Sequence, residues 1–384
     1  MRVLISAGEA SGDLYASRVV DALRARVPDA EFFGCAGPRM QAAGVRPIVD
    51  SRSLAVAGLV EVLPHIPRVY RQYRKLIRAI VTEQPDIAVL TDAPDFHLRL
   101  AKHLRRHGVP VIYLIAPQAW AWRQGRVRTM RATIARLLCI FPFEEKFFRD
   151  HGVTASYIGH PLAGIVRPSL TRSEFCEQFN LPLDARIVAL LPGSRHGEVE
   201  RHMPVLLDAV RLISQSHQVN FVLALPPGFG VERTSFWERI RGSSIQVKEG
   251  STWDALAQAE LALAASGTVT IEAALLGVPM VTFYRVNALS WILGRWLVRA
   301  PFLSMVNLIA GRRIVPELIQ GDMTAERIAS EAAKLLDSEE ARSAMRADLA
   351  EVAARLSVDG DPMGTAAEWI ERVFRESRET VVAS

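Results

Sequence analysis

Residues 192–195 combine features that suit them to bind a diphosphate. This Pro-Gly-Ser-Arg turn follows five apolar residues that predict a buried strand, and apolar residues at helical spacing over 198–213 predict a helix after it. Gly193 lets the backbone approach a ligand, and the helix start offers unpaired N–H groups and about half a positive charge. Arg195 adds a planar guanidinium suited to phosphate. We therefore expect Gly193, Ser194 and Arg195 to bind a diphosphate, the alternative being an ordinary turn with a surface arginine.

A second turn of small residues, Ser266, Gly267 and Thr268, also follows an apolar run and precedes a predicted helix. Glu272 comes four residues after Thr268 and therefore lies one helical turn along on the same face. A carboxylate in that place can accept hydrogen bonds from the two hydroxyls of a ribose. Together, the two turns predict a nucleoside-diphosphate site better than either turn does alone.

Acidic residues follow two predicted strands of the first half of the chain. Asp92 is the first residue after the strand over 86–91, and chemistry in open α/β sheets takes place outside the carboxyl ends of strands, so Asp92 is a candidate general base. Asp95 precedes a helix, and we expect it to be the N-cap. Glu9 lies in a loop that either binds a ligand or is a plain turn in which Asp13 serves a helix start. No third acid follows Asp92 and Asp95 closely, so no metal site is expected.

Trp120, Trp122 and Arg123 follow the predicted strand over 111–115. Such side chains could line a site for a sugar or an acyl chain, although tryptophan more often fills a core. We therefore keep both interpretations of this segment.

The segment after Pro67 predicts a helix with one apolar and one basic face. Val69 begins the apolar face, and arginines including Arg68 and Arg71 form the basic one. A basic amphipathic helix is typical of binding to a membrane surface. On this pattern alone, a surface helix packed on the sheet with a solvated basic face is favoured.

These residues need a scaffold that brings strand ends together. Strands and helices alternate along a chain of 384 residues, which is too long for one core, so we expect two doubly wound α/β domains. Their predicted bounds are 1–163 and 164–363, with a last helix over about 364–376 that crosses back to the first domain. The glycine spacing at 8–12 is not a dinucleotide fingerprint, and no Lys-Ser/Thr pair forms a P-loop.

The composition of the chain limits which ligands, metals and membrane contacts we expect. The net charge of +5 suits anionic ligands or an anionic membrane surface and does not require nucleic acid. The three cysteines are widely spaced, which indicates a reducing compartment and argues against a structural zinc site. No run of 18 uncharged apolar residues is present, so we expect no membrane-spanning helix.

Seven motifs occur in an order that is specific as a set. They are Gly-Glu-Ala-Ser-Gly-Asp at 8–13, Ala-Gly-Pro-Arg-Met at 36–40, Asp-Ala-Pro-Asp-Phe at 92–96, Trp-Ala-Trp-Arg at 120–123, Phe-Pro-Phe-Glu at 141–144, Pro-Gly-Ser-Arg at 192–195 and Ser-Gly-Thr at 266–268. With these motifs the chain closely resembles the lipid-A-disaccharide synthase family from about residue 3 to residue 375. One departure is His97, where the family pattern has Asn, and we expect it to alter the hydrogen bonding beside Asp95.

The resemblance implies the GT-B architecture, in which two Rossmann-like domains face each other across a cleft. It implies an inverting transfer from UDP-2,3-diacylglucosamine to 2,3-diacylglucosamine 1-phosphate, giving a β-1,6-linked disaccharide and UDP without a metal or other cofactor. Asp92 would take the proton of the acceptor's 6-hydroxyl, and Glu9 would orient one of the sugars. Asn307 and Arg312 lie where the family pattern is strong, so they join the donor-site candidates.

Acylated substrates change the interpretation of the basic helix. Because long acyl chains stay in a bilayer, a membrane role is now favoured, with Val62, Leu63 and Ile66 entering the bilayer and the basic face on anionic headgroups. The expected location is cytoplasmic and peripheral, on the inner membrane, and two copies could pair as a homodimer. Two other classes stay open, a UDP-N-acetylglucosamine 2-epimerase and a non-catalytic, nucleotide-dependent membrane-binding protein.

Overall fold

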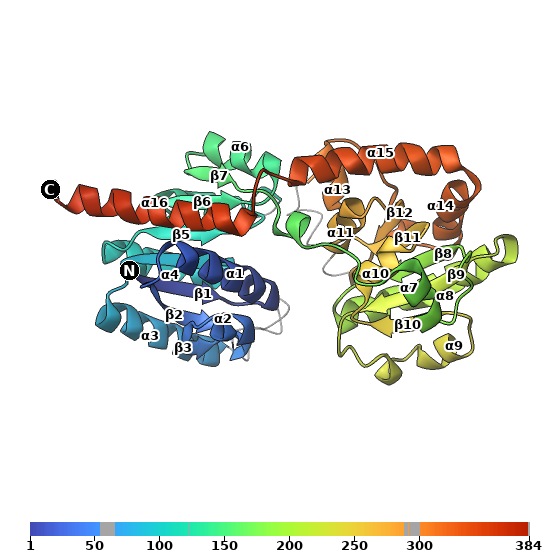
Figure 1. Ribbon diagram of the computed structural model, residues 1–384, viewed down its shortest axis with the longest axis horizontal. Coiled ribbons are helices and arrows are strands. Elements are labelled where there is room, and N and C mark those ends of the chain that lie inside the picture. Colours follow the sequence, from blue (N-terminus) through green and yellow to red (C-terminus); the bar gives the residue numbers. More distant parts are fainter. Residues whose placement is uncertain (54–65, 122, 288–290, 292–299, 383–384) are drawn as a thin grey trace. The chain divides into compact units, whose positions relative to one another are not determined.

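The computed structural model describes residues 1–53, 66–121, 123–287, 291 and 300–382, and the chain folds into two compact units. The first unit holds residues 1–164 together with the residues from 358 onward, and the second holds residues 165–357. In each unit, helices pack on a parallel sheet (Figure 1). The predicted class, two parallel-sheet α/β domains, is therefore confirmed.

The first unit is built on a seven-stranded sheet in which every pairing is parallel. Its strands are β1 (Arg2–Ala7), β2 (Glu31–Ala36), β3 (Arg46–Asp50), β4 (Ile87–Thr91), β5 (Val111–Leu114), β6 (Arg136–Cys139) and β7 (Ala155–Tyr157). The order is β3-β2-β1-β4-β5-β6-β7, so the winding of the chain reverses between β1 and β4. In such sheets, the carboxyl ends of the two strands at the reversal form the usual ligand site.

Helices cover this sheet in two groups. They are α1 (Ala10–Arg26), α2 (Pro38–Ala42), α3 (Ile66–Glu83), α4 (Pro94–Arg106), α5 (Gly125–Thr133), α6 (Pro142–Asp150) and α16 (Pro362–Val382). Helix α1 packs against α2 and α16, and α4 packs against α3 and α5. Helix α16, dark red in Figure 1, buries Met363 and Ile370, and its Glu368 and Glu371 pair with Arg26 of α1. The last helix of the chain thus belongs to the first unit.

The second unit contains a six-stranded parallel sheet with the order β10-β9-β8-β11-β12-β13. Its strands are β8 (Ile187–Leu191), β9 (Asn220–Leu225), β10 (Gln246–Glu249), β11 (Leu261–Ala265), β12 (Met280–Tyr284) and β13 (Glu317–Ile319). Its helices are α7 (Arg172–Gln178), α8 (His196–Ser216), α9 (Trp237–Arg241), α10 (Thr252–Ala257), α11 (Val269–Leu275), α13 (Met305–Ala310), α14 (Ala325–Asp337) and α15 (Glu339–Leu356). Here the winding reverses between β8 and β11, which are paired in register over 188–191 and 261–264.

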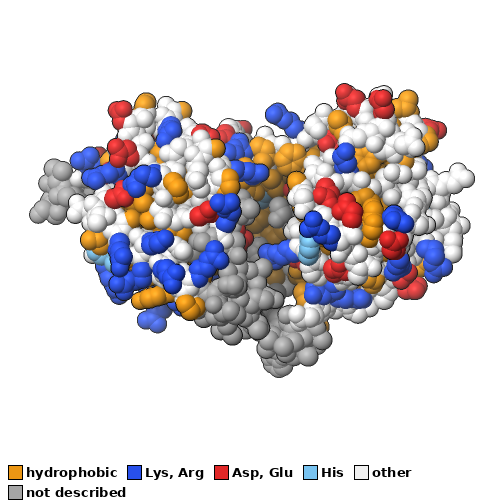
Figure 2. Space-filling view, turned by 90° about the horizontal axis from the view of Figure 1, so that it is seen from below, with side chains coloured by type: hydrophobic (Ala, Val, Ile, Leu, Met, Phe, Trp, Pro, Cys, Tyr) orange, Lys and Arg blue, Asp and Glu red, His pale blue; other side chains and the backbone are white. Residues whose placement is uncertain are grey.

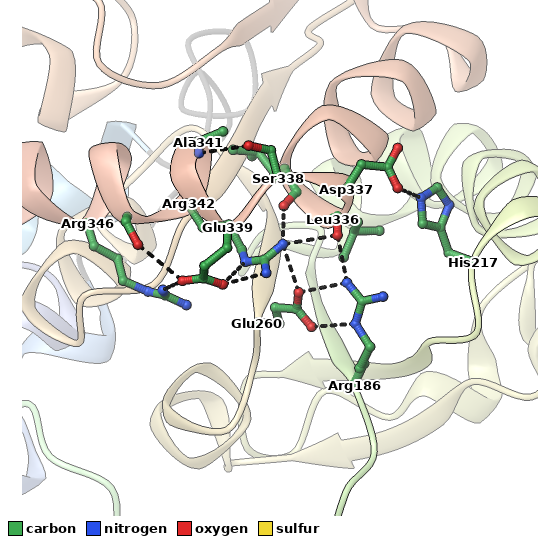
Figure 3. Close-up of polar contacts among 12 residues, drawn as sticks. Arg186, His217, Glu260, Leu336, Asp337, Ser338, Glu339, Ala341, Arg342 and Arg346 are labelled. Carbon is green, nitrogen blue, oxygen red and sulfur yellow. Dashed lines mark hydrogen bonds and ion pairs between the residues drawn. The ribbon is translucent and has the colours of Figure 1, made fainter.

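An ionic network fastens the amino ends of β8 and β11 (Figure 3). Arg186, just before β8, donates two hydrogen bonds of 2.8 Å to Glu260, just before β11. Arg342 of α15, which is only 9% exposed, approaches the same carboxylate at 3.0 Å and donates to the Leu336 carbonyl at the end of α14. The two central strands and two covering helices are therefore joined at the end of the sheet opposite the predicted ligand turns.

Candidate active site

In the first unit, the loops that leave β1 and β4 meet at the reversal of the sheet. Asp92 directly follows β4, and Gly8 directly follows β1, the neighbouring strand. The Asp92 carboxylate accepts the backbone N–H of Gly8 at 2.7 Å and that of Glu9 at 3.0 Å. A side chain from one strand end thus holds the backbone of the other, although the two are 84 positions apart in the sequence.

The environment of Asp92 favours its protonated form. Burial is the main cause, and it raises the pKa of this carboxyl from 3.8 to about 8. The two N–H donors oppose the shift by stabilising the anion, while the charges of Glu9 and Asp13 add to it. A carboxylate whose pKa lies near the working pH can accept a proton and give it up again, which is what a general base needs.

Gly8 and Gly12 have no side chains, and the space that this leaves is filled by the Asp92 carboxylate. A Cβ atom at Gly12 would lie 1.8 Å from Oδ2 of Asp92, and one at Gly8 would lie 2.9 Å from Oδ1. Both distances are shorter than non-bonded contacts of real Cβ atoms, so any other residue would displace the carboxylate. The glycine spacing noted in the sequence therefore serves the close approach of a side chain, at a site where no phosphate-binding fingerprint is present.

His97 fixes the backbone beneath this carboxylate. Its Nδ1 lies 2.9 Å from the Asp92 carbonyl oxygen, which can only accept, so Nδ1 bears the proton and Nε2 accepts the hydroxyl of Ser6 at 2.7 Å. Burial lowers the pKa of His97 to about 4, which keeps the ring neutral. The buried Tyr113 hydroxyl donates to the same carbonyl. The ring of His97 thus takes part in the hydrogen bonding of this loop at the Asp92 carbonyl and at Ser6.

Asp95 is not the N-cap of α4. That position belongs to Ala93, and Asp95 lies in the first helical turn with a side chain that is 69% exposed. Its carboxylate is paired with Arg123 and Arg126. The prediction failed because Asp92 and Ala93 adopt left-handed backbone angles, so that the helix begins at Pro94, two residues earlier than the pattern indicated.

Glu9 stands at the N-cap of α1, and its side chain is exposed. The nearby Asp13 is buried and accepts the N–H groups of Gly37, Arg39 and Met40 at 2.8–3.2 Å. Asp13 therefore serves a helix start, but that of α2. Glu9 faces solvent beside Asp92, to whose pKa its charge contributes.

In the second unit, both predicted nucleotide turns lie side by side because β8 and β11 are neighbours. Gly193 has a φ of 129°, and Arg195 is the N-cap of α8 with a side chain that is 69% exposed. Glu198, in the first turn of α8, accepts the N–H of Ser194 at 3.4 Å and lies 3.8 Å from the Arg195 guanidinium. A carboxylate already occupies this turn, so its donors are arranged to hold a negatively charged group.

The second turn brings a hydroxyl and an acid to the same edge. The Ser266 hydroxyl is buried and has no hydrogen-bond partner in the described part of the chain. Thr268 is the N-cap of α11, whose first turn contains Glu272. Burial raises the pKa of Glu272, and a hydrogen bond from Trp253 opposes that shift. An unsatisfied buried hydroxyl is costly, which favours a ligand partner for Ser266.

His202 of the second unit resembles His97 of the first, because its ring also binds the backbone carbonyl of the residue after a central strand. Its Nδ1 donates to the Pro192 carbonyl at 2.7 Å, so Nε2 is the acceptor for the Arg285 N–H at 3.1 Å. Burial lowers the pKa of this ring, which is thus held neutral. His202 was not predicted from the sequence, although a histidine within the apolar stripe of the 198–213 helix is a visible signal.

Asn307 and Arg312 have structural partners. Asn307 is fully buried, donates to Val315 and Glu317, and accepts two N–H groups from residues 314 and 315 at 2.7 and 3.0 Å. All four hydrogen-bonding positions of its amide are thus engaged. Arg312 makes two hydrogen bonds to Asp348 of α15, at 2.7 and 3.1 Å. We therefore leave both residues out of the donor site proposed below.

The acceptor and membrane candidates lie on the first unit. Trp120 is half-buried, and its Nε1 donates to the fully buried Glu144 at 3.0 Å. Val69 is half-buried on α3, while Arg68 and Arg71 are exposed. Figure 2 shows Lys and Arg side chains gathered on the first unit, over the region of α3. Val62, Leu63, Trp122 and the side chain of Ile66 lie outside the described residues.

Within the described ranges, no group of three His, Cys, Asp or Glu side chains is placed to hold a metal ion. In the same part of the chain, no helix is long and apolar enough to cross a bilayer.

A family model described as lipid-A-disaccharide synthetase matches residues 3–358. The chain belongs to this family. The lipid-A-disaccharide synthase of Solibacter usitatus is 59% identical over 373 residues, with 97% of each chain covered. That of Myxococcus xanthus is 44% identical over 362 residues, with 94% of each chain covered. The protein is thus a glycosyltransferase of lipid A biosynthesis, as the seven motifs predicted.

Solved structures of more distant proteins share the fold of the lipid-A-disaccharide synthetase chain. The glycotransferase of kitacinnamycin superposes with a TM-score of 0.63 at 16% identity, covering 97% of this chain and 98% of that one. The UDP-GlcNAc 2-epimerase of Neisseria meningitidis reaches 0.63 at 12% identity, covering 98% and 100%. These likenesses show the fold alone and include both enzyme classes. The sequence relatives separate the classes, so the epimerase and the non-catalytic alternatives are not favoured.

Exchanging His97 tests whether its hydrogen bond positions Asp92. His97→Asn should keep glycosyl transfer within a few-fold of wild type, because an amide nitrogen near the place of Nδ1 still donates to the Asp92 carbonyl. His97→Leu fills the space without a donor and should lower kcat by about tenfold or more. Thermal melts of both variants control for folding. Equal kcat values for the two variants would mean that the ring only fills space.

Proposed function

We propose that this enzyme joins UDP-2,3-diacylglucosamine to 2,3-diacylglucosamine 1-phosphate, with Asp92 as general base. The product is a β-1,6-linked disaccharide 1-phosphate, and UDP is released. The observation that supports the base is the Asp92 carboxylate, held by two backbone N–H groups where the first sheet reverses. Its side chain is 14% exposed, so one edge is open to a substrate hydroxyl.

The reaction is a single displacement. The proton of the acceptor's 6-hydroxyl passes to Asp92, the oxygen bonds to the anomeric carbon of the donor, and the bond from that carbon to the diphosphate oxygen breaks. The configuration inverts because the oxygen attacks opposite the departing UDP. Removal of the proton by a positioned base accounts for a factor of about 10² to 10⁴ in rate. Glu9, whose side chain is exposed beside Asp92, would contact a sugar hydroxyl.

The second unit would bind the donor, UDP-2,3-diacylglucosamine. The N–H of Ser194, the start of α8 and Arg195 would hold the diphosphate, with Glu198 displaced by the more highly charged ligand. The same groups stabilise the charge that UDP acquires as it leaves. Glu272 would accept the ribose hydroxyls, and Ser266 and Gly267 would line the other side of the nucleotide.

Because the acyl chains of the substrates stay in a bilayer, the enzyme must bind at the surface of that bilayer. We propose that α3 lies on the cytoplasmic face of the inner membrane, where each exposed arginine contributes about 1 kcal/mol near an anionic surface. Val62, Leu63, Ile66 and Val69 would supply the apolar contact. Tyr70, on the same helix, is 57% exposed, which is unusual for a large aromatic side chain and suits an interfacial position.

Asp92→Asn should lower kcat by about 10² to 10⁴-fold with UDP affinity unchanged. Because only the ionised carboxylate accepts a proton, the wild-type rate should rise with pH and level off above about 8. Normal turnover by Asp92→Asn would rule out Asp92 as the base.

The same carboxyl should make the stability of the protein depend on pH. Because its pKa is higher in the folded than in the unfolded chain, it stabilises the fold fully below pH 3.8, and this stabilisation is lost as the pH rises through about 8. Between pH 3.8 and about 8, the melting temperature of Asp92→Asn should therefore fall less steeply than that of the wild type.

Arg195→Ala should weaken UDP binding by about tenfold, since it removes one charged donor from the turn. Glu198→Gln should tighten binding several-fold, because the competing carboxylate is gone. Titration calorimetry with UDP measures both effects. Arg211→Ala, an exposed arginine further along α8, is the matched control. If Arg195→Ala binds UDP as the control does, the diphosphate does not bind at this turn.

Reversing the charge of Arg68, Arg71 and Arg74 tests the membrane surface. The triple glutamate variant should lose most of its binding to vesicles that contain anionic lipid, and wild-type binding should fall with added salt. The control reverses the exposed Arg233, Arg239 and Arg241 of the second unit. Co-sedimentation at two salt concentrations measures the binding. Equal loss by both variants, or salt-independent binding by the wild type, contradicts the proposed role of α3.

A further inference from the structure

Three donors surround the carboxylate of Glu198 at the turn over 192–195. The Tyr284 hydroxyl donates to Oε1 at 3.2 Å, and the backbone N–H of Ser194 donates to Oε2 at 3.4 Å. The guanidinium of Arg195 lies 3.8 Å from Oε1. Tyr284 is the last residue of β12, so the donors come from the loop after one strand and from the end of another. Tyr284 belongs to none of the seven sequence motifs.

The distances at this turn are long for a carboxylate. Hydrogen bonds to a charged group are usually about 2.5–2.9 Å long, and Asp92 of the first unit accepts its two N–H groups at 2.7 and 3.0 Å. Glu198 has two oxygens for three donors, and it reaches none of them at the usual distance. The space between the donors therefore suits an anion with more oxygen atoms than a carboxylate, such as a phosphate group.

Tyr284 is held in place without the help of Glu198. Strand β12 pairs with β13 through Tyr284 and Ile319, and the Tyr284 side chain is half-buried. The centroid of its ring lies 5.6 Å from that of the His202 ring. His202 in turn accepts the N–H of Arg285, the next residue along the chain, at 3.1 Å. The hydroxyl should therefore keep its position when Glu198 moves away.

The surroundings of the Tyr284 hydroxyl keep it protonated and able to donate. Burial is the main cause that raises its pKa above the ordinary value of 10.0, and the charge of Glu198 adds to that rise. The charges of Arg195 and Arg201 oppose the rise, so both arginines are close enough to act on the hydroxyl. A neutral donor among cationic groups suits an anion, because it adds a hydrogen bond without a further charge.

The turn over 266–268 is attached to the residue that precedes Tyr284. The Ser266 backbone N–H donates to the carbonyl of Phe283 at 2.8 Å. The Ser266 hydroxyl oxygen is buried and lacks a hydrogen-bond partner among the described residues. Because a buried hydroxyl without a partner is costly, this second observation, which does not involve Glu198, points to a ligand at the same edge of the sheet.

We propose that Tyr284 binds the diphosphate of the donor directly: the nucleotide displaces the Glu198 carboxylate, and the Tyr284 hydroxyl then donates to a phosphate oxygen. This inference rests on the proposed function for the identity of the nucleotide. Tyr284 is the third donor to the diphosphate, beside the N–H of Ser194 and the guanidinium of Arg195. Because UDP gains charge as it leaves, the same hydroxyl also stabilises the departing diphosphate.

Calorimetry with UDP and with uridine, which lacks phosphate, tests this role of Tyr284. Tyr284→Phe should lower the affinity for UDP by about tenfold, because one hydrogen bond to a charged group is lost. The affinity for uridine should not change. Thr282→Val, which removes another hydroxyl from β12, is the matched control. Thr282 donates to the Pro316 carbonyl, so this variant should bind UDP as wild type does.

The sign of the effect separates a phosphate donor from a residue that only holds Glu198. If Tyr284 only holds Glu198, its removal frees the carboxylate, and UDP should bind equally well or more tightly. In the Glu198→Ala background, Tyr284→Phe should still weaken UDP binding by about tenfold. The inference is overturned by unchanged or tighter UDP binding in Tyr284→Phe, by no effect in the Glu198→Ala background, or by an equal loss for UDP and uridine.

An assay for disaccharide formation tests the proposed function separately. If wild type makes no disaccharide while UDP binding depends on Tyr284, the inference stands and the proposed transfer fails. If wild type makes disaccharide and Tyr284→Phe binds UDP as wild type does, the function stands and the inference fails. Failure of the wild type to bind UDP also overturns the inference.

Discussion

The burial of one carboxylate constrains the architecture of the first unit. Asp92 is held at the junction of β1 and β4 by N–H groups of the opposite loop, in space that Gly8 and Gly12 leave open. An ionised carboxylate in such a place is costly unless donors face it, and the pKa of about 8 expresses the remaining cost. His97 and Tyr113 hold the Asp92 carbonyl, so that backbone and side chain are positioned together.

The second unit repeats this arrangement with a different chemical outcome. There too a small-residue turn follows a central strand, and a buried neutral histidine, His202, binds the first carbonyl after it. The side chain that occupies the turn is again an acid, Glu198, but it comes from the helix and takes up donors suited to a phosphate. One scaffold thus presents a buried carboxylate at one sheet, and at the other a turn whose N–H group and arginine face a carboxylate.

The ionic network of the second unit lies at the opposite end of its sheet. Arg186, Glu260 and Arg342 join the amino ends of β8 and β11 to α14 and α15, and their pairing lowers the pKa of Glu260. This network joins the two strands at their amino ends and involves none of the polar residues of the turns at their carboxyl ends. Exposed pairs of this kind contribute little stability individually, so the buried Arg342 is the member on which this attachment depends.

The sequence alone determined what depends on neighbouring residues. Apolar runs, glycine-containing turns and helical spacing located the strands and both small-residue turns, and the motifs located the family, because these signals are contained within a few residues. Which strands pair was decided by the tertiary structure, since β1 and β4, or β8 and β11, are separated by a long stretch of chain. The partners of a side chain were decided there too. Asn307 and Asp95 are polar residues in marked motifs, yet one is saturated within the core and the other pairs with two arginines, because hydrogen bonds form between residues that only the fold brings together.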